Sequence, residues 1–574
     1  MRTHLHINLQ DRSVREEKLD GGEIVRAGRH YIARTLLKDR VYSVDPLSPD
    51  NPLIFSAGPF AGTNFSNANR ISVGCRSPLT GGIKESNSGG TFAYALGQLE
   101  IAGLTLHGAS AEWVVIRIAK GGGVTFESAA PFMGRGNFEA AALLFEKYGR
   151  KVSFALCGPV GEYLGLVAGI AFTDTDGRPS RLAARGGVGA LMGGKKVKAI
   201  VADIDKMPTF HDRKKLMGGI REYGRRLGRE PAIENYKRYG TASMGDFTNR
   251  VGGLPVRNFS GGRMVDASKE TFKLGGDHIR ERNLSRGGQP SHACMPGCQI
   301  ECSNVYVDAN GKELVSPLEY ETIVMMGCNC GLDDPDDVAE LNAVANDLGI
   351  DTIEIGATLS MLMDAGHGAF GDKAFMLAAL EDLRSGNERG RLLSQGTTRV
   401  GEYYRAARVP AIKKQGISAY DPRVIEVTGI SMMLTAQGAD HTTGHVPAYD
   451  CNGKTTAELV AVSLEAQTMF AAGDSLGLCI FGRIVTNAGQ DLLATALNDA
   501  HGTCLDASFF RSLGREALTM EWEFNRKAGF TEADDELPSF FKEPVPPTGK
   551  TARHSAAEIN RSLRCLLAGS DPAS

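Results

Sequence analysis

The sequence predicts an α+β protein in which a β-rich N-terminal domain is followed by two mainly α-helical domains. Residues 1–205 contain short apolar runs separated by glycine-rich turns, which is the pattern of strands. From residue 206 onward, apolar residues recur at helical spacing instead. A chain of 574 residues is also too long for one hydrophobic core. We therefore expect three domains, at 1–205, 206–412 and 413–574.

The first region contains four apolar runs bounded by glycine-rich turns, and we expect each run to form a strand. They are Leu53–Ser56, Trp113–Ile118, Ile170–Thr173 and Ala199–Ala202. One helix is expected in this region, over Gly136–Tyr148.

The clearest helix prediction in the later regions is Asp334–Leu348. Asp333 or Asp334 can cap its N-terminus, acidic residues fill its first turn, and Gly349 can end it. Three further helices are expected, at Thr352–Ala365, Ala457–Ala472 and Gln490–His501, and the proline-rich segment Glu543–Thr548 is expected to be a loop.

Composition and charge exclude several classes of protein. Apolar residues make up 42% and charged residues 23%, and the formal net charge is only -3. We therefore expect no nucleic-acid partner, because binding to phosphates needs a strongly basic surface. The polar N-terminus predicts no signal peptide, and without an apolar stretch of about 18 residues we expect no membrane span. A cytoplasmic location follows as the expectation.

Glycine is unusually frequent, with 70 residues in 574, or about 12% against an average near 7%. The glycines form short clusters, including Thr80–Ile83, Ser88–Gly90 and Arg185–Gly194. Such clusters let a backbone approach a ligand or another backbone closely.

Three of the eleven cysteines, Cys294, Cys298 and Cys302, fall within nine residues. Thiolates gathered on one loop in a reducing compartment indicate metal or cluster ligation. An iron–sulfur cubane needs a fourth thiolate from elsewhere. Two other interpretations stay open: a zinc site completed by His292, and three cysteines with no shared role.

Cys479 is the candidate for the fourth thiolate, and it ends the run Asp474–Cys479, of the form Asp-x-x-Gly-Leu-Cys. A carboxylate at a helix end can accept hydrogen bonds from a flat heterocycle with amide and amino groups. A related run, Asn346–Asp351, lies about 130 residues earlier. Two such runs would suit a cofactor with two halves, although helix capping and turn formation also explain their polar residues.

Together these motifs resemble the aldehyde ferredoxin oxidoreductase family, and the resemblance covers almost the whole chain. Several segments agree with the family in its order: Val44–Asp50, Ala57–Pro59, Arg76–Gly81, Asn87–Gly90, Arg185–Gly189, Glu319–Glu321, Tyr420–Arg423 and Asp474–Cys479. The resemblance implies an N-terminal domain that serves as a base for two molybdopterins, which sandwich one tungsten or molybdenum. It also implies one 4Fe-4S cluster near the pterins, with a magnesium ion between the pterin phosphates and a homodimer as further options.

The resemblance assigns cofactor roles residue by residue. Cys294, Cys298, Cys302 and Cys479 resemble the cluster ligands. The pterin-binding set comprises Asn346, Gly349 and Asp351 of the first run, Asp474, Gly477 and Leu478 of the second, Arg70 between cluster and pterin, and Asn87, Arg185, Gly186 and Gly187 in loops near the phosphates. Glycine amides and a basic side chain are chemically suited to phosphate.

Glu321 and His441 resemble the acid–base residues beside the metal, and Glu340 occupies the place where some relatives bind a metal between subunits. A carboxylate in an apolar stretch, such as Glu321, is uncommon unless it is paired or functional. The structural alternatives are a supporting role for Glu321 and a hydrogen-bonding role for His441.

The sequence departs from the family pattern at three places. Ser291 stands where the first cysteine of the loop is usual, and Cys302 substitutes from the other side. The first pterin run begins with Asn346 rather than an aspartate, which removes a charge. Cys328 and Cys330 follow Glu321 closely; Cys328 either packs as a small apolar residue or approaches the metal.

The segment Gly189–Lys195 has the glycine and lysine spacing of a P-loop, but Lys196 stands where a hydroxyl must bind magnesium. Nucleotide hydrolysis is therefore excluded. The expected reaction is the oxidation of an aldehyde to a carboxylic acid, with electrons passing through the cluster to ferredoxin or a partner redox subunit. The alternative keeps these cofactors and acts on a 2-oxo acid or an aromatic thioester within a larger complex. A zinc-stabilised binding protein without redox chemistry is the alternative from another class.

Overall fold

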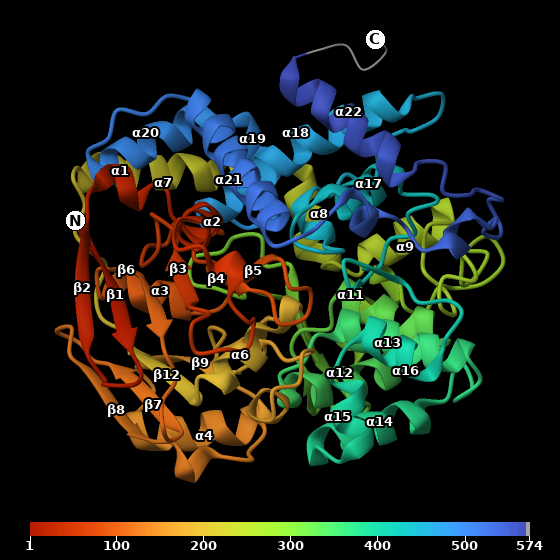
Figure 1. The fold of residues 1–574 in the computed structure, drawn as a ribbon, viewed down its shortest axis with the longest axis horizontal. Helices are drawn as coiled ribbons and strands as arrows, with labels where there is room; N and C mark the ends of the chain where they lie inside the picture. The colour runs from red at the N-terminus through yellow and green to blue at the C-terminus, as the bar shows by residue number, and fades with distance from the viewer. Residues whose placement is uncertain (570–574) are drawn as a thin grey trace.

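The computed structural model describes residues 1–569 as an N-terminal part with two β-sheets and a longer, mainly helical part. Figure 1 shows the sheets in red to yellow on one side, with the helices of the middle of the chain beside them and the C-terminal helices across the top. The α+β prediction, with its β-rich domain before the helical region, is confirmed.

Each sheet has six strands. The first has the order β2-β1-β6-β3-β4-β5, built from β1 (Arg2–Asn8), β2 (Val14–Leu19), β3 (Leu53–Ala57), β4 (Ile71–Arg76), β5 (Ile83–Ser88) and β6 (Ile101–His107). The second has the order β11-β10-β9-β12-β7-β8, built from β7 (Val114–Ile118), β8 (Val124–Ser128), β9 (Val152–Cys157), β10 (Ile170–Phe172), β11 (Arg181–Ala183) and β12 (Val197–Asp203). Pairing is antiparallel except between β1 and β6 and between β7 and β12.

The two sheets share one hydrophobic core, which includes Phe55 and Val73 from the first sheet and Ile116 and Ile200 from the second. The other face of the first sheet packs against α2 (Gly28–Lys38) and α21 (Ser508–Lys527), where Ile54 joins a separate cluster. Because both faces are covered, β3 and β4 are almost fully buried, and β3 has a nearly continuous apolar sequence.

Six short helices connect these strands or cover the sheets. Besides α2 they are α1 (Gly21–Ile24), α3 (Phe92–Gln98), α4 (Asn137–Tyr148), α5 (Pro159–Glu162) and α6 (Val188–Gly194). The expected helix at Gly136–Tyr148 is therefore confirmed as α4, and Gly136 serves as its N-cap residue.

The middle of the chain is helical apart from a three-stranded sheet and a two-stranded one, in which β16 (Ala411–Ile412) pairs with β17 (Gln415–Gly416). Its helices are α7 (Arg213–Leu227), α8 (Pro231–Tyr239), α9 (Ser243–Val251), α10 (Gly276–Ser285), α11 (Tyr320–Thr322), α12 (Pro335–Leu348), α13 (Thr352–Asp364), α14 (Lys373–Ser385), α15 (Glu388–Leu393) and α16 (Thr397–Tyr404). The three-stranded sheet contains β13 (Gln289–His292), β14 (Ser303–Val307) and β15 (Glu313–Val315).

The C-terminal helices are α17 (Glu426–Leu434), α18 (Thr456–Ser475), α19 (Arg483–Ala488), α20 (Gln490–His501), α21 and α22 (Ala556–Ala568). Helix α18 packs against α21, α17 and α22. Within residues 1–569 no single helix is long and apolar enough to cross a membrane; α18 and Ile480–Ala488 pass that test together, but the chain bends by 119° between them.

The ends of α12 and α18 place the two predicted pterin runs. Asp334 caps α12 by accepting a hydrogen bond from the Asp336 amide at 2.9 Å, and the helix ends at Gly349 with φ of 71°. The next helix, α13, begins at once, because the Asp351 side chain accepts from the Ile353 amide at 2.9 Å. The first run is therefore a tight link between two capped helices.

Candidate active site

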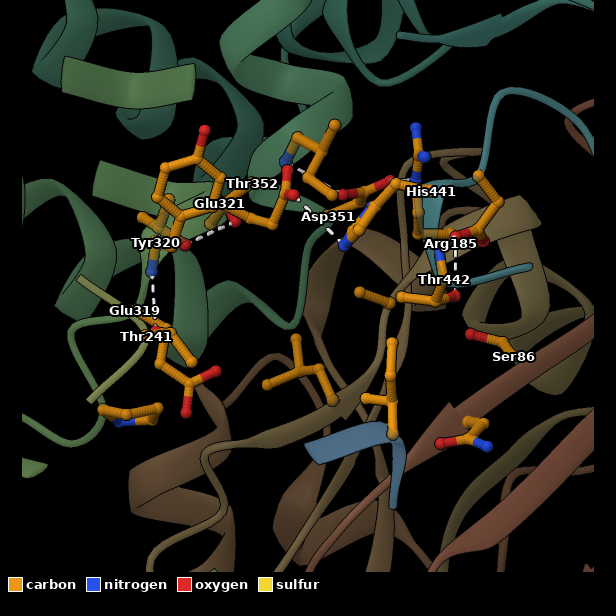
Figure 2. A pocket seen from close by; sticks show the side chains of 18 of the residues that line it. Ser86, Arg185, Thr241, Glu319, Tyr320, Glu321, Asp351, Thr352, His441 and Thr442 are labelled. Carbon is orange, nitrogen blue, oxygen red and sulfur yellow. Dashed lines mark hydrogen bonds and ion pairs between the residues drawn. The ribbon is translucent and has the colours of Figure 1, made fainter. Parts of the chain in front are cut away.

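A cavity of about 350 Å³ lies where the N-terminal sheets meet the helical part of the chain. Figure 2 shows Glu321, Asp351, Arg185 and His441 along one side of it, with Ser86 and Glu319 nearer the sheet side. Eight of the residues predicted to act in catalysis or pterin binding line this cavity: Arg70, Asn87, Arg185, Glu321, Asn346, Asp351, His441 and Asp474. The structure thus gathers side chains that are up to 400 residues apart in the sequence.

The two pterin runs meet the two sheets in the same way. At the end of β3, Gly58 lies so close to the second run that a Cβ atom on it would stand 2.3 Å from the Leu476 carbonyl oxygen. At the end of β9, a Cβ atom on Gly158 would stand 2.2 Å from the Leu348 carbonyl oxygen of the first run. Proline follows each glycine. Each sheet therefore holds one run against a Gly-Pro corner that tolerates no side chain.

An arginine contacts the last residue of each run. Arg70 directs Nη1 toward Cys479 Sγ at 3.9 Å and Nη2 to the Asn87 carbonyl oxygen at 3.1 Å. Arg185 donates from Nε to Asp351 Oδ2 at 3.2 Å and from Nη1 to the Ala439 carbonyl oxygen at 2.6 Å. Arg70 thus lies between the cavity and Cys479.

Asp474, the first residue of the second run, belongs to a buried network of charged side chains. Its Oδ1 accepts from Asn87 Nδ2 at 3.2 Å and its Oδ2 from Arg29 Nη1 at 3.2 Å. Arg29 also makes a two-pronged ion pair with Glu521, at 2.7 and 2.8 Å. Burial raises the pKa of Asp474 to about 6, against the lowering effect of Arg29. The side chain is held in place by the protein while it faces the cavity.

Glu85 is a cavity residue that the sequence analysis did not single out. It is only 8% exposed, and its Oε1 atom has no hydrogen-bond partner among residues 1–569. Burial, and then the nearby Asp474 charge, raise the pKa of Glu85 to about 8. The sequence does contain a signal for Glu85, because Glu85 and Asn87 are two residues apart on β5 and so share one face of the strand.

Asn346 faces the cavity with its side-chain amide unpaired. It is 6% exposed, and its Nδ2 atom has no partner in the described chain. Its carbonyl oxygen accepts from Asn137 Nδ2 at 2.9 Å, which fixes the backbone of the first run to α4. An aspartate offers only acceptors, whereas this asparagine offers two N–H donors as well.

The four predicted cluster cysteines converge beside the cavity. Cys294, Cys298 and Cys302 lie on the loop between β13 and β14 and pack in one cluster with Cys479. The charges of these groups act on the pKa values of Cys294, Cys298 and Cys302. Burial and then these mutual charges raise the pKa of Cys294 to about 12 and that of Cys298 to about 11. These raised pKa values favour neutral thiols, and binding as thiolates would need a cationic centre among them, which cluster iron would supply.

The zinc interpretation fits this geometry poorly. His292 directs Nε2 toward Asp174 Oδ2 at 3.4 Å rather than toward the cysteines. Within residues 1–569, no group of three or more His, Cys, Asp or Glu side chains surrounds a point where one metal ion could bind. Cubane ligands bind four separate iron atoms, so they surround a larger space than the ligands of a single ion do.

Unpartnered polar atoms concentrate around the cavity. Five buried side-chain atoms that lack a partner within residues 1–569 belong to lining residues: Glu85 Oε1, Ser180 Oγ, Asn346 Nδ2, His441 Nδ1 and His445 Nδ1. Buried polar groups are normally satisfied. A polar heterocyclic cofactor such as a pterin would satisfy several of them, so the lining fits the group that the family carries.

Glu321 and His441 form a pair on the cavity wall. The Glu321 Oε1 atom lies 3.1 Å from His441 Nε2, and Oε2 accepts from the Ala419 amide at 3.0 Å. Burial raises the pKa of Glu321, while His441 opposes that change. Asp440 caps the turn that carries His441 by accepting from the Thr442 amide at 3.1 Å, and Lys84 holds Asp440 at 2.9 Å.

Two further aromatic side chains complete this wall. The His445 ring centroid lies 5.6 Å from that of His441, and Tyr420 lies 5.3 Å from His441 and 4.5 Å from His445. Burial, followed by the His441 charge, lowers the pKa of His445 well below its ordinary value. His445 is therefore neutral, and Nδ1 is free to bond a ligand. No local sequence pattern marks His445, because its burial and its unpartnered Nδ1 atom arise only in the tertiary structure.

Part of the cavity lining is apolar. Its side chains include Leu182, Met244, Ile350, Ile353, Ile480 and Phe481. Tyr236 of α8, whose ring lies 4.8 Å from Phe481, and Met244 of α9 also line an outer cavity of about 410 Å³. These two side chains therefore separate an inner chamber from an outer one.

The other residues singled out from the sequence shape the backbone or bond to other parts of the protein. Gly186, with φ of 82°, packs on Lys84, and Gly349, Gly477 and Leu478 shape the two runs without lining the cavity. The Ser291 hydroxyl donates to the Glu301 carbonyl oxygen at 3.0 Å. Gly187 turns the chain into α6 with φ of 78°.

Three further predictions concern residues away from the cavity. Cys328 is fully buried in the largest core cluster and does not line the cavity, which favours packing. Glu340 pairs with Lys373 at 2.5 Å. Lys195 of the P-loop-like segment donates to two backbone carbonyl oxygens, at 3.2 and 2.9 Å, so it is committed to structure.

Comparison with known proteins gives consistent matches along the chain. Residues 4–204 match the family model for the aldehyde ferredoxin oxidoreductase N-terminal domain, and residues 219–566 match the model for domains 2 and 3 of the same family. The tungsten-containing aldehyde ferredoxin oxidoreductase of Pyrococcus furiosus is 30% identical over 96% of this chain and 93% of its own length. The corresponding enzyme of Thermococcus kodakarensis is also 30% identical, with the same coverage.

More distant matches share the architecture. The aliphatic sulfonate oxidoreductase WOR-like subunit of Pyrococcus furiosus is 22% identical over 90% of this chain and 84% of its own length. Among solved structures, the active-site complex BamBC of benzoyl coenzyme A reductase, with bound 1,5-dienoyl-CoA, matches with a TM-score of 0.81. That match has 18% identity and covers 100% of this chain and 95% of the other. It shows that the fold is shared.

Proposed function

The chain belongs to the aldehyde ferredoxin oxidoreductase family, and from that membership we propose that it oxidises an aldehyde to a carboxylic acid at a bis-pterin tungsten or molybdenum centre. Its electrons would pass through one 4Fe-4S cluster to ferredoxin or to a partner redox subunit. The observation that carries the proposal is the Glu321–His441 pair, at 3.1 Å, on the wall of a cavity that also receives both pterin runs. That the chain is an oxidoreductase follows from the family itself.

In this proposal the chain supplies the ligands for both cofactors. Cys294, Cys298, Cys302 and Cys479 would hold the cluster. The pterin rings would meet Asn346 and Asp474, and Asn87 and Arg185 lie where the phosphates are expected, with a magnesium ion between them as an option. When bound, the metal centre accepts two electrons from the substrate and the cluster relays them one at a time.

The protein's own residues would manage the protons. Overall, an aldehyde and one water give a carboxylic acid, two electrons and two protons. A new bond forms between the water oxygen and the carbonyl carbon, and the aldehyde C–H bond breaks. Glu321, held by the Ala419 amide, would take a proton from water, and His441 would donate a hydrogen bond to the carbonyl oxygen as charge develops there.

The shape of the cavity would select the substrate. The apolar side chains Ile353, Ile480 and Phe481 favour a hydrophobic group on the aldehyde. Tyr236 and Met244, which separate the outer chamber from the inner one, would limit the width of that group.

A dye-linked activity screen tests the proposed reaction. Anaerobically purified protein should reduce a low-potential dye with an apolar or aromatic aldehyde as electron donor. The screen should include 2-oxo acids and aromatic thioesters, which are the substrates of the alternative function. Turnover with one of those classes and none with any aldehyde would replace the proposed reaction by the alternative one.

A further inference from the structure

The cysteine loop reaches the protein surface at Gly297 and Gln299, which are exposed. Cys298 and Ile300, which alternate with them, are buried. Two helices flank it there. On one side, a Cβ atom built on Gly224 of α7 would lie 2.6 Å from Gln299 Nε2. On the other side, Lys237 of α8 pairs with Glu301 of the loop at 2.9 Å. The surface nearest the four cysteines is therefore bounded by α7 and α8.

This boundary is strongly basic, although the whole chain is not. Residues 213–238 contain nine lysines and arginines against three glutamates, whereas the chain as a whole has a net charge of -3. Glu222 pairs with Arg225 at 2.6 Å and with Arg226 at 2.9 Å, so part of the charge is balanced locally. Lys215 also pairs with Asp212 at 3.4 Å, and the remaining positive charge lies on the helices that flank the cysteine loop.

One face of α7 displays the charge in a row. Lys214, Arg221 and Arg225 are exposed, and their spacing of seven and four residues places them on the same side of a helix. We call these three residues the basic stripe. Gly218, between the first two, has no atom within 4 Å of the position of a Cβ atom, so the stripe is open to an approaching partner.

The buried side of α7 belongs to the same hydrophobic cluster as the cysteines. Leu216, Tyr223 and Leu227 pack in the cluster that contains Cys298, Cys302 and Cys479. The Tyr223 hydroxyl lies 3.2 Å from Asn67 Oδ1, and the Asn67 carbonyl oxygen accepts from the Cys479 amide at 2.8 Å. One helix, roughly 10 Å across, thus separates the stripe from the cysteines.

An apolar residue stands near the same surface. Ile484 of α19 is 45% exposed, and α19 packs against α7. An exposed apolar side chain beside a charged rim is the usual composition of a protein–protein interface.

We propose that the basic stripe of α7 docks a small acidic iron–sulfur protein that exchanges single electrons with the cluster. The inference rests on the proposed function, because it assumes that the four cysteines hold a redox cluster. A negatively charged carrier is complementary to Lys214, Arg221 and Arg225 and would be steered to α7, which lies between the stripe and the cysteines. In each encounter one electron moves between the carrier and the cluster. The partner that gives the electron is oxidised by one charge unit, and the partner that takes it is reduced by one.

Electron transfer in the reverse direction tests the proposal without any aldehyde. A reduced, acidic ferredoxin with one two-iron cluster, whose visible spectrum differs from that of a four-iron cluster, is mixed with the oxidised holoenzyme, and the two spectra are followed in a stopped-flow instrument. For Arg221→Glu/Arg225→Glu, we expect the second-order rate constant at low salt to fall about tenfold or more. The decrease of the rate with increasing salt should also become weaker.

The chain offers a matched control on a distant helix. Arg561 and Arg564 are exposed on α22, and Arg564 pairs with Glu532 just as Arg225 pairs with Glu222. Arg561→Glu/Arg564→Glu should leave the ferredoxin rate within about twofold of the wild-type value. Reduction by a viologen radical, which needs no docking site, should not slow in either variant. Lys214→Glu serves as a milder single variant if the double variant binds less iron.

Two results would overturn the proposal. In the first, the stripe and control variants slow the ferredoxin reaction equally. In the second, the stripe variant changes only a salt-dependent self-association of the chain, which would assign the stripe to a second copy. Failure of the proposed aldehyde oxidation would look different, because the wild-type cluster would still accept electrons from ferredoxin.

Discussion

At the scale of single residues, the arrangement of Glu321 and His441 predicts a shared role in proton transfer. Glu321→Gln and His441→Asn should each keep full cluster and metal content, because neither side chain contacts the cysteines or the pterin runs. Each should lower turnover by roughly 10²–10⁴-fold, the usual effect of losing one general acid or base. Steady-state kinetics beside metal analysis measures both quantities. Near-normal turnover in both variants, with cofactors intact, would make the pair structural.

Glu85 gives a second residue-scale prediction, which concerns stability rather than activity. Its pKa is raised from 4.5 to about 8 by burial and by Asp474. A carboxyl group with a raised pKa binds its proton more tightly in the folded state. Its stabilising contribution is therefore complete below about pH 4.5 and is lost as the pH rises through about 8. In the cofactor-free chain, the melting temperature should fall across this window.

The matched variant for this effect is Glu85→Gln, which keeps the size of the side chain but cannot ionise. Between about pH 5 and pH 8.5 the melting temperature of the wild-type chain should fall relative to that of the variant. Parallel melting curves across the whole range would show that Glu85 is not protonated when folded.

The sequence identified many of the cavity residues but not all of them. The resemblance named Arg70, Asn87 and Asp474, which belong to recognisable motifs. Glu85 and His445 were missed, because their importance depends on burial and on unpartnered atoms that only the tertiary structure produces. Arg29 was missed as well, since nothing in its local sequence shows that it pairs with Glu521, 492 residues away.

At the scale of elements, the cysteines of the loop between β13 and β14 are spaced differently from those usual in the family. Because Ser291 bonds to Glu301 and Cys302 lies among the other cysteines, Cys302 is the proposed ligand. Cys302→Ala should therefore lose iron and visible absorbance. Cys75→Ala is the control, since Cys75 is also buried but lies in the core between the two sheets. Equal iron content in the two variants would show that the proposed ligand set is wrong.

The predicted strands and helices lie close to observed ones; Leu53–Ser56, for example, corresponds to β3. Caps and spacing placed α12 and α20 within a residue of their observed ends. In contrast, the polar segment Arg2–Asn8 forms an interior strand, β1, which pairs in parallel with β6 about 100 residues later. Its buried residues Leu5 and Ile7 alternate with polar ones, but local pattern does not reveal a distant partner strand.

At the scale of the whole molecule, two sheets hold two pterin runs through equivalent Gly-Pro corners. This relation was not predicted, although Gly58-Pro59 and Gly158-Pro159 each follow a buried apolar strand. The close approach of each corner to its run is a tertiary contact, so the sequence shows only the dipeptides. The division into domains at 1–205, 206–412 and 413–574 remains a prediction.

The cofactor content of the intact protein tests the central claim most directly. Purified without oxygen, the protein should contain about four irons, two pterins and one tungsten or molybdenum per chain, with the brown colour of a four-iron cluster. Metal analysis, pterin fluorescence after oxidation and visible absorbance measure these quantities on one sample. Stoichiometric zinc in place of iron, with no pterin and no visible absorbance, would contradict the account.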